Sequence, residues 1–312
     1  MAVQQLVFGG NARKGLSGLR NLDTVADPSV TWRGDRWWMV LGGTHGQDRV
    51  IKLFTAESTV ANDGWRIMTA QDDPGLAVQL ADAPTPDGWD ATGYHCPAYA
   101  RGRDASGAVV ERIYYASSSS FDSLYGPYQI GYLQLMGDDW VRRPEPVFTA
   151  SEPWERGTVL EPNVLFCDGR WLLRYTAGLA TGALAMTGLV ESPDGVSGWR
   201  RIGAPEARQF DAHVIAGDHG FDLIISRHPL DSKFTPDDGL WHSRGENPDG
   251  PWNPAQQLVS TIDGTDWHQS GVWKPTAVRE NGRLVVFSTV AQPGENPYVP
   301  ALGIGMYEVS AD

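Results

Sequence analysis

The chain alternates between short apolar runs and polar turns, and this pattern repeats five times. Each repeat opens on a polar residue, usually before a proline, and continues through an apolar stretch, a turn and a second apolar run. Apolar runs joined by Gly, Asp or Asn turns are typical of β-hairpins. The repeats begin at Asp27 (DPSVTWRGDRWWMVL), Cys96 (CPAYARGRDASG), Glu161 (EPNVLFCDGRWLLRY), Asp211 (DAHVIAGDHGFDLII) and Lys274 (KPTAVRENGRLVVF).

Four repeats also end alike, on a turn followed by a tryptophan (Trp65, Trp140, Trp199 and Trp252). We expect each tryptophan to lie in an outer hairpin and to pack between neighbouring sheets. Successive repeats start 69, 65, 50 and 63 residues apart, which leaves room for four strands per repeat. The pattern predicts an all-β fold, a five-bladed β-propeller that forms a single domain over residues 1–312. Separate β-sandwich domains are the alternative.

Composition and charge narrow the choice of partner and compartment. The chain has 312 residues and a formal net charge of −13, which argues against a nucleic acid or an anionic membrane surface as partner. Two cysteines form no disulfide framework. No apolar run is long enough for a signal peptide or a membrane span. We therefore expect a cytoplasmic protein with a small-molecule substrate.

Equivalent positions on the five inner strands of a propeller point toward one central axis. The residues that head the repeats are therefore expected to meet, and we call them the central ring (Asp27, Cys96, Glu161, Asp211 and Lys274). Carboxylates brought together raise one another's pKa, and groups whose pKa values are pushed apart can act as general acid and general base. The alternative is that these residues cap strand ends and face solvent.

Two stretches resemble a known enzyme family. ADPSV, followed by a Gly-Asp turn and an aromatic strand, resembles the first blade of family 43 glycoside hydrolases and their relatives in family 32, and ENPDGPW resembles their blade ends. The resemblance implies an enzyme in which Asp27 is the general base that activates water. In that family a third-blade Asp tunes pKa and a fourth-blade Glu is the general acid, whereas this chain has Glu161 and Asp211 in those positions. The acid and the modulator have exchanged roles, or the chemistry differs.

Lys274 is the oddest member of the central ring. The related enzymes commonly have a histidine near a bound metal in the fifth blade, so a fixed ammonium would replace that cation, and we predict no metal and no cofactor. Lys274 could equally grip an anionic substrate, act as a base, or form a plain salt bridge. Cys96 is expected to line the site as an inert thiol.

Further side chains are candidates for binding substrate near the strand starts. These are His95, His213, His268, Arg227 and Trp273. No zinc-protease, P-loop or dinucleotide motif appears.

Together these features predict hydrolysis of a small glycoside or furanoside by carboxylate acid–base catalysis. In an inverting enzyme, the acid and the base stand roughly 6.5–9.5 Å apart, with water between the base and the sugar. One alternative is a non-glycosidase enzyme of a biosynthetic pathway on the same scaffold, such as a lyase, cyclase or other hydrolase. Another is a propeller that binds sugar without catalysis.

Overall fold

The computed structural model describes residues 3–10, 14–122, 126–179, 185–207, 209–217, 219–228, 233–292 and 301–309. Within these ranges the chain forms strands β1 to β23 and one 3-10 turn, Pro153–Glu155. The strands build five sheets of a five-bladed β-propeller, so the predicted fold class is confirmed. Within the described residues, no helix is long and apolar enough to cross a membrane.

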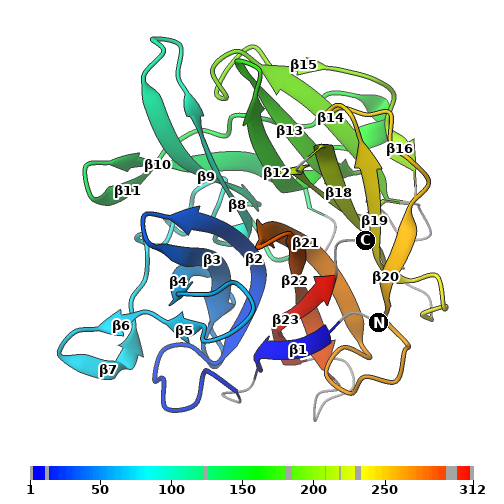
Figure 1. The fold of residues 1–312 in the computed structure, drawn as a ribbon. Coiled ribbons are helices and arrows are strands. Elements are labelled where there is room, and N and C mark those ends of the chain that lie inside the picture. The colour runs from blue at the N-terminus through cyan, green and yellow to red at the C-terminus, as the bar shows by residue number, and fades with distance from the viewer. Residues whose placement is uncertain are drawn as a thin grey trace.

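Each blade is an antiparallel meander that runs outward from the axis (Figure 1). Blade 1 contains β2 (Thr24–Arg33), β3 (Arg36–Thr44), β4 (Lys52–Ser58) and β5 (Arg66–Ile67). Blade 2 contains β8 (His95–Arg103), β9 (Val109–Ser117), β10 (Gln129–Met136) and β11 (Asp139–Arg142). Blade 3 contains β12 (Val159–Cys167), β13 (Arg170–Ala177), β14 (Met186–Ser192), β15 (Arg200–Arg201) and β16 (Glu206–Ala207).

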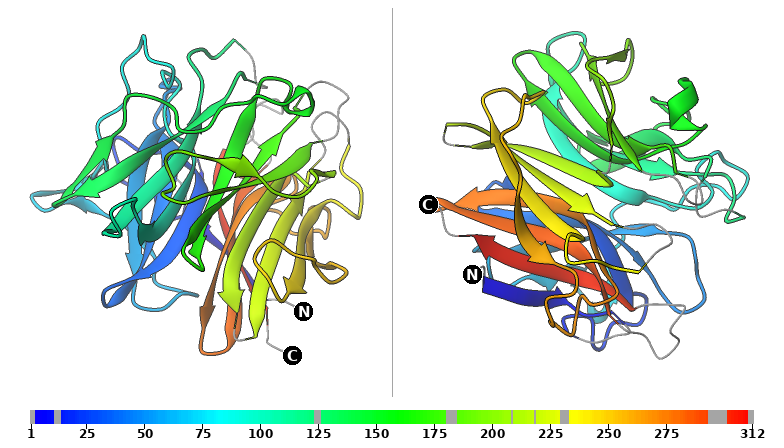
Figure 2. Two further views of the ribbon diagram at one scale, coloured as in Figure 1. Left: turned by 90° about the horizontal axis from the view of Figure 1, so that it is seen from above. Right: turned by 90° about the vertical axis from the view of Figure 1, so that its right-hand side faces the viewer.

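Blade 4 contains β17 (Asp211–Gly217), β18 (Gly220–Arg227), β19 (Gly239–Gly245) and β20 (Gln256–Ser260). Blade 5 combines both ends of the chain, because β21 (Gly271–Glu280), β22 (Arg283–Gln292) and β23 (Ala301–Val309) are completed by β1 (Val3–Phe8). Pairing of β1 with β23 joins the two ends of the chain and closes the circle of blades (Figure 2). A small hairpin, β6 (Thr69–Ala70) and β7 (Asp73–Ala77), lies outside blade 1.

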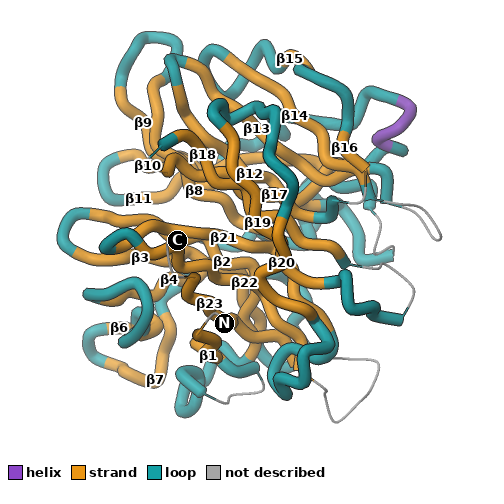
Figure 3. Tube along the Cα trace, turned by 45° about the vertical axis from the view of Figure 1, so that its right-hand side comes forward, coloured by secondary structure: helices purple, strands orange, loops and turns teal. Residues whose placement is uncertain are grey.

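The five inner strands β2, β8, β12, β17 and β21 contact one another in a closed cycle, as the predicted repeat alignment requires. Strands dominate the molecule, and loops gather at the ends of the blades (Figure 3). Because each blade is antiparallel, the start of its first strand, the end of its second and the start of its third lie at one end of the propeller. We call this the ring end.

The blade-end tryptophans pack between neighbouring blades, as predicted. Trp65 of blade 1 packs edge-on against Phe287 of blade 5, with ring centroids 5.5 Å apart. Trp140 of blade 2 stacks on Trp38 of blade 1 at 6.2 Å. The other two make equivalent contacts: Trp199 meets Phe148 at 6.3 Å, and the Arg174 guanidinium lies 5.4 Å from the Trp252 ring. These contacts hold the blades together beside their hydrogen bonds.

Proline shapes the inner strands where the central ring is carried. Asp27, Cys96, Glu161 and Lys274 each precede a proline, and each has a positive φ between 49° and 57°. The strand register shifts at each of these positions, which is the signature of a β-bulge. A left-handed non-glycine residue is strained, and such strain concentrates at functional sites. Asp211, which precedes alanine, lies in an unbroken register instead.

Candidate active site

The structure brings the members of the central ring together at the ring end. Backbone and side chains of different blades are directly linked there. The Cys96 N–H donates to Asp27 Oδ2 at 3.1 Å, and the Lys274 N–H donates to Asp211 Oδ2 at 2.6 Å. Thus Asp27 and Asp211 each bind the bulged residue of the next blade, so both carboxylates help to join blades as well as line the ring.

Asp27 is half-buried and held from two sides. Besides the Cys96 N–H, it accepts a hydrogen bond at 3.0 Å from the Thr289 hydroxyl through Oδ1. The Asp27 N–H in turn donates to Thr289 Oγ1 at 2.7 Å. Each carboxylate oxygen therefore has one donor and a lone pair to spare, which fixes the orientation of a carboxylate that still reaches solvent.

Glu161 and Asp211 are buried together, with exposed fractions of 6% and 1%. Glu161 Oε2 and Asp211 Oδ1 are buried and have no hydrogen-bond partner. Burial raises the pKa of Glu161 well above its usual range, and the charge of Asp211 raises it further. Burial also raises the pKa of Asp211 to about 6, against the lowering effect of the Lys274 ammonium. Two buried carboxyls in contact favour holding a proton.

Lys274 supplies the positive charge next to this pair. Its Nζ donates to the Pro162 carbonyl at 2.8 Å and lies 3.7 Å from Glu161 Oε2. Its side chain is almost completely buried, so its charge acts on the carboxyls rather than on solvent. A metal ion, which the family resemblance implies near the fifth blade, does not fit these residues, because the ammonium already holds the cation position and would repel it.

Cys96 connects the two parts of the site. Its N–H donates to Asp27, and the charge of Glu161 acts on its thiol. Burial raises the pKa of the Cys96 thiol well above its usual range, and the charges of Asp27 and Glu161 raise it further. A thiol kept protonated is a poor nucleophile, and the role of Cys96 as an inert pocket-lining residue stays a prediction.

His95 and Tyr128 lie next to the central ring. The His95 Nε2 is 3.2 Å from the Thr92 carbonyl oxygen, and its ring meets the Tyr128 ring edge-on at 5.5 Å. Burial lowers the pKa of His95, although the charge of Asp27 opposes this effect. A neutral imidazole therefore faces the Asp27 side of the site.

Sequence reasoning missed Tyr128, which precedes β10. Burial raises the pKa of its phenol to about 12, and the nearby Cys96, Glu161 and Asp27 contribute to the rise. Tyr128 is therefore a neutral hydroxyl among the acidic groups, able to donate a hydrogen bond to a substrate. It lies within the second repeat, in GPYQIG between β9 and β10 and beyond the aligned segment, so the repeat alignment carried no signal for it.

His213 lies on β17 two residues beyond Asp211 and therefore on the same face of the strand. Its Nδ1 is 2.7 Å from the Asn163 side-chain nitrogen, and its Nε2 is buried without a partner. Burial lowers the pKa of His213 to about 3, helped by the charge of Lys274. His213 is thus a neutral histidine of blade 4 that is bonded to Asn163 of blade 3.

Trp273 forms an aromatic group at the ring end of blades 4 and 5. Its ring lies 5.2 Å from the His228 ring, and His228 also contacts Phe210 at 5.7 Å and Phe234 at 5.3 Å. All four side chains are half-buried, so part of this aromatic surface reaches solvent. Arg227, another residue predicted to bind substrate, places its guanidinium 3.8 Å from the Trp241 ring centroid.

His268 does not belong to this group. It is completely buried, its Nε2 is 2.8 Å from Asp263 Oδ1, and its Nδ1 is 3.2 Å from the Tyr307 hydroxyl. With both ring nitrogens engaged and no exposed surface, His268 offers a substrate nothing. Its position before β21 predicted a place at the rim of the site, but the turn before β21 packs the His268 ring against Tyr307 of β23.

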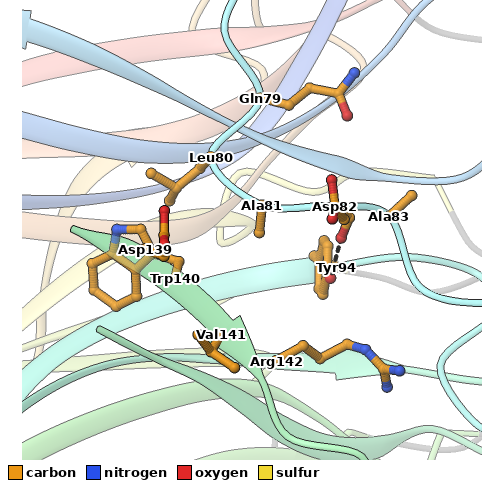
Figure 4. A pocket seen from close by; sticks show the side chains of 10 residues that line it. All are labelled: Gln79, Leu80, Ala81, Asp82, Ala83, Tyr94, Asp139, Trp140, Val141 and Arg142. Atoms are coloured by element: carbon orange, nitrogen blue, oxygen red, sulfur yellow. Dashed lines mark hydrogen bonds between the residues drawn. The ribbon is translucent and has the colours of Figure 1, made fainter. Parts of the chain in front are cut away.

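The pocket in Figure 4 is separate from the central ring. It has a volume of about 670 Å³ and lies between the 79–83 segment and the edge strand β11. Tyr94 donates from its hydroxyl to the Asp82 carbonyl at 2.6 Å there. Arg142, which also lines it, pairs with the buried Asp90 at 3.0 Å, so its charge is already balanced. This pocket lies on the outer flank and holds no residue of the ring.

Comparisons with known proteins bear on the fold. No family model and no curated protein sequence matches the chain. Among solved structures, a family 117 glycoside hydrolase from the marine bacterium Zobellia galactanivorans matches with a TM-score of 0.66 and 13% identity, over 99% of this chain and 90% of that one. The chain shares its fold with five-bladed β-propeller glycoside hydrolases and phosphorylases.

Two further matches have the same character. A thermostable family 43 glycoside hydrolase matches with a TM-score of 0.61 and 15% identity, over 91% of this chain and 88% of that one. A sucrose-6-phosphate hydrolase from Lactobacillus gasseri matches with a TM-score of 0.62 and 13% identity, over 95% of this chain and 64% of that one. At such identities the likeness is one of fold, and function rests on the site.

Proposed function

We propose that this protein is a glycoside hydrolase that cleaves a small glycoside or furanoside with inversion at the anomeric carbon. The observation that carries the proposal is the contrast within the central ring. Glu161 and Asp211 form a buried pair that favours holding a proton, whereas Asp27 is half-exposed and anchored by two donors. Carboxylates in two such environments supply the acid and the base that glycoside hydrolysis needs.

Glu161 acts as the general acid. Because its pKa is raised well above the usual range, it carries a proton at a pH where an ordinary glutamate has lost it. It gives that proton to the glycosidic oxygen as the bond to the anomeric carbon breaks. Asp211, held by the Ser226 hydroxyl at 2.9 Å and by the Lys274 N–H, keeps negative charge next to Glu161 and so supports its protonated form.

Asp27 acts as the general base on the opposite face of the sugar. It takes a proton from water, and the resulting hydroxide adds to the anomeric carbon while the leaving group departs. Asp27 and Glu161 lie on the inner strands of blades 1 and 3, and Cys96 of blade 2 comes between them in the cycle of inner strands. Inverting enzymes leave room for water, with roughly 6.5–9.5 Å between the two carboxyl groups, and the proposal requires such a separation between Asp27 and Glu161.

The neighbouring side chains suit a sugar. Tyr128 offers a neutral hydroxyl donor, and Trp273 with its aromatic neighbours offers a partly exposed apolar face. Sugar-binding sites combine apolar surface with a few placed polar groups in this way. Lys274 is buried and bound to Pro162 and Glu161, so it serves the carboxyls rather than an anionic substrate.

The test is a screen of 4-nitrophenyl pyranosides and furanosides, followed by proton NMR of the first anomer released. Release of 4-nitrophenol with an inverted anomer is expected for at least one sugar, and the Asp27→Asn protein should lose that activity. Turnover with retained configuration, or full activity of Asp27→Asn, would contradict the mechanism.

A second candidate is a non-glycosidase reaction on the same scaffold, because Cys96 and Lys274 in the ring depart from the pattern that the family resemblance implies. A third is sugar binding without catalysis. Binding of a sugar with no turnover anywhere in the screen would favour the last of these.

A further inference from the structure

A second, apolar pocket lies at the ring end, between the loops of blades 1 and 2. It has a volume of about 430 Å³, within the range of roughly 300–1,000 Å³ usual for small-molecule sites. Its walls are largely apolar, formed by Val50, Pro84, Pro86, Ala91 and Phe121. None of these belongs to the central ring, and neither the repeat pattern nor the acid–base mechanism accounts for the pocket.

The polar side chains around this pocket are mostly occupied with each other. Lys52 Nζ donates to Asp48 Oδ2 at 2.7 Å, so the two charges balance at the rim. The Arg49 guanidinium lies 4.6 Å from the centre of the Phe121 ring. A second sugar would bring several hydroxyls that need partners, and these walls offer few. An apolar ring loses nothing by entering.

Thr92 is hydrogen-bonded both to segments that carry the pocket walls and to His95 beside the central ring. The Ile51 N–H donates to the Thr92 carbonyl at 3.1 Å, and the Ser118 N–H donates to the Thr92 hydroxyl at 3.1 Å. These bonds fix the three segments that carry the pocket walls. The same carbonyl oxygen lies 3.2 Å from His95 Nε2, and the charge of Asp27 raises the pKa of His95 against the effect of burial. Thr92 therefore links the segments that carry the pocket walls to His95, which lies next to the central ring.

We propose that this pocket binds an apolar ring carried by the substrate, so that the substrate is a glycoside of an aromatic or alicyclic alcohol rather than an oligosaccharide. This inference rests on the proposed function. Phe121 is 36% exposed, which leaves part of its ring free to stack, and the two prolines form walls that need little ordering on binding.

The first experiment measures binding of 4-nitrophenol alone, by titration calorimetry, and so needs no catalysis. Wild type should bind it, and Phe121→Ala should bind about three- to tenfold more weakly, because one aromatic contact is lost. Phe121→Tyr keeps the ring and should bind as wild type. Val109→Ala, which truncates an apolar side chain that is 53% exposed at the opposite end of blade 2, is the matched control and should change nothing.

The second experiment compares the methyl and 4-nitrophenyl glycosides of the sugar that is hydrolysed. Phe121→Ala should raise KM for the aryl substrate by a similar factor and leave KM for the methyl substrate unchanged. Equal effects on both substrates, or no binding of 4-nitrophenol to wild type, would overturn the assignment of this pocket. Binding of 4-nitrophenol without hydrolysis of any glycoside would overturn the proposed function and leave the ligand class of the pocket standing.

Discussion

Two parts of the central ring carry the same chemical group in opposite environments. Asp27 is half-exposed, and each of its oxygens receives a donor, from Cys96 and from Thr289. Glu161 and Asp211 are buried, and each has an oxygen without any donor. Hydrogen bonds to the charged form favour a carboxylate, whereas burial favours a carboxylic acid. The comparison teaches that position around the ring, more than residue type, separates base from acid.

The largest loss of activity is expected when Asp27, the half-exposed carboxylate, is replaced. Asp27→Asn removes the base but keeps an oxygen able to accept from Cys96 or Thr289. We expect kcat/KM to fall by about 10²–10⁴-fold, the usual cost of losing a general base, with little change in unfolding temperature. Steady-state kinetics with thermal unfolding as control measures both. A large loss of stability instead would mean that Asp27 mainly joins blades 1 and 2.

The effect of replacing Glu161, a buried carboxyl, should depend on the leaving group of the substrate. Glu161→Gln cannot donate a proton, so substrates with a basic leaving group should lose about 10²–10⁴-fold in kcat/KM. Aryl glycosides, whose phenolate departs without help, should lose much less. Asp27→Asn should be equally harmful to both substrate classes. If Glu161→Gln also affects both classes equally, the acid is another residue, and Asp211 is the next to test.

Replacing Lys274 should change the pH dependence of kcat/KM. Its ammonium lowers the pKa of both Glu161 and Asp211, so its removal lets these values rise. In Lys274→Met, the alkaline limb of the kcat/KM profile, where the acid loses its proton, should therefore move to higher pH. Lys274→Arg should keep the limb near its wild-type position. An unshifted limb in a folded Lys274→Met protein would contradict this account.

Much of the fold and the ring could be predicted because both depend on repetition. The same proline-bounded pattern occurs in every blade but the fourth, so one alignment placed Asp27, Cys96, Glu161 and Lys274 at equivalent positions. The structure shows that each of these positions is a bulge. Asp211 could be placed too, although without proline its strand keeps a regular register. Repetition fixes position along a blade, and position along a blade fixes which side chains meet.

Environment could not be predicted in the same way. Tyr128 belongs to a connection between strands, and no repeat position marks it. His268 was expected at the rim, yet its partners Asp263 and Tyr307 come from a turn and from β23, contacts that exist only in the folded chain. The difference in burial between Asp27 and Glu161 likewise depends on how neighbouring blades cover each residue. Such differences arise from packing between distant segments, which a local pattern does not encode.

The smallest effect is expected in stability, and it concerns Asp211. Its pKa of about 6 in the folded protein lies above the usual value of 3.8, so the folded state binds its proton more tightly than the unfolded chain does. This contribution to stability is complete below about pH 4 and is lost as pH rises through about 6. Asp211→Asn removes the titration while keeping an acceptor for the Ser226 hydroxyl or the Lys274 N–H. Urea unfolding at pH 4 and pH 7 should therefore show wild type losing on the order of 1–3 kcal/mol more than the variant over this interval. Equal losses in both proteins would mean that Glu161 alone holds the shared proton. A larger loss in the variant would mean that Asp211 is ionised in the folded protein over this whole pH range. In that case Glu161 and Asp211 would not be a pair of buried acids.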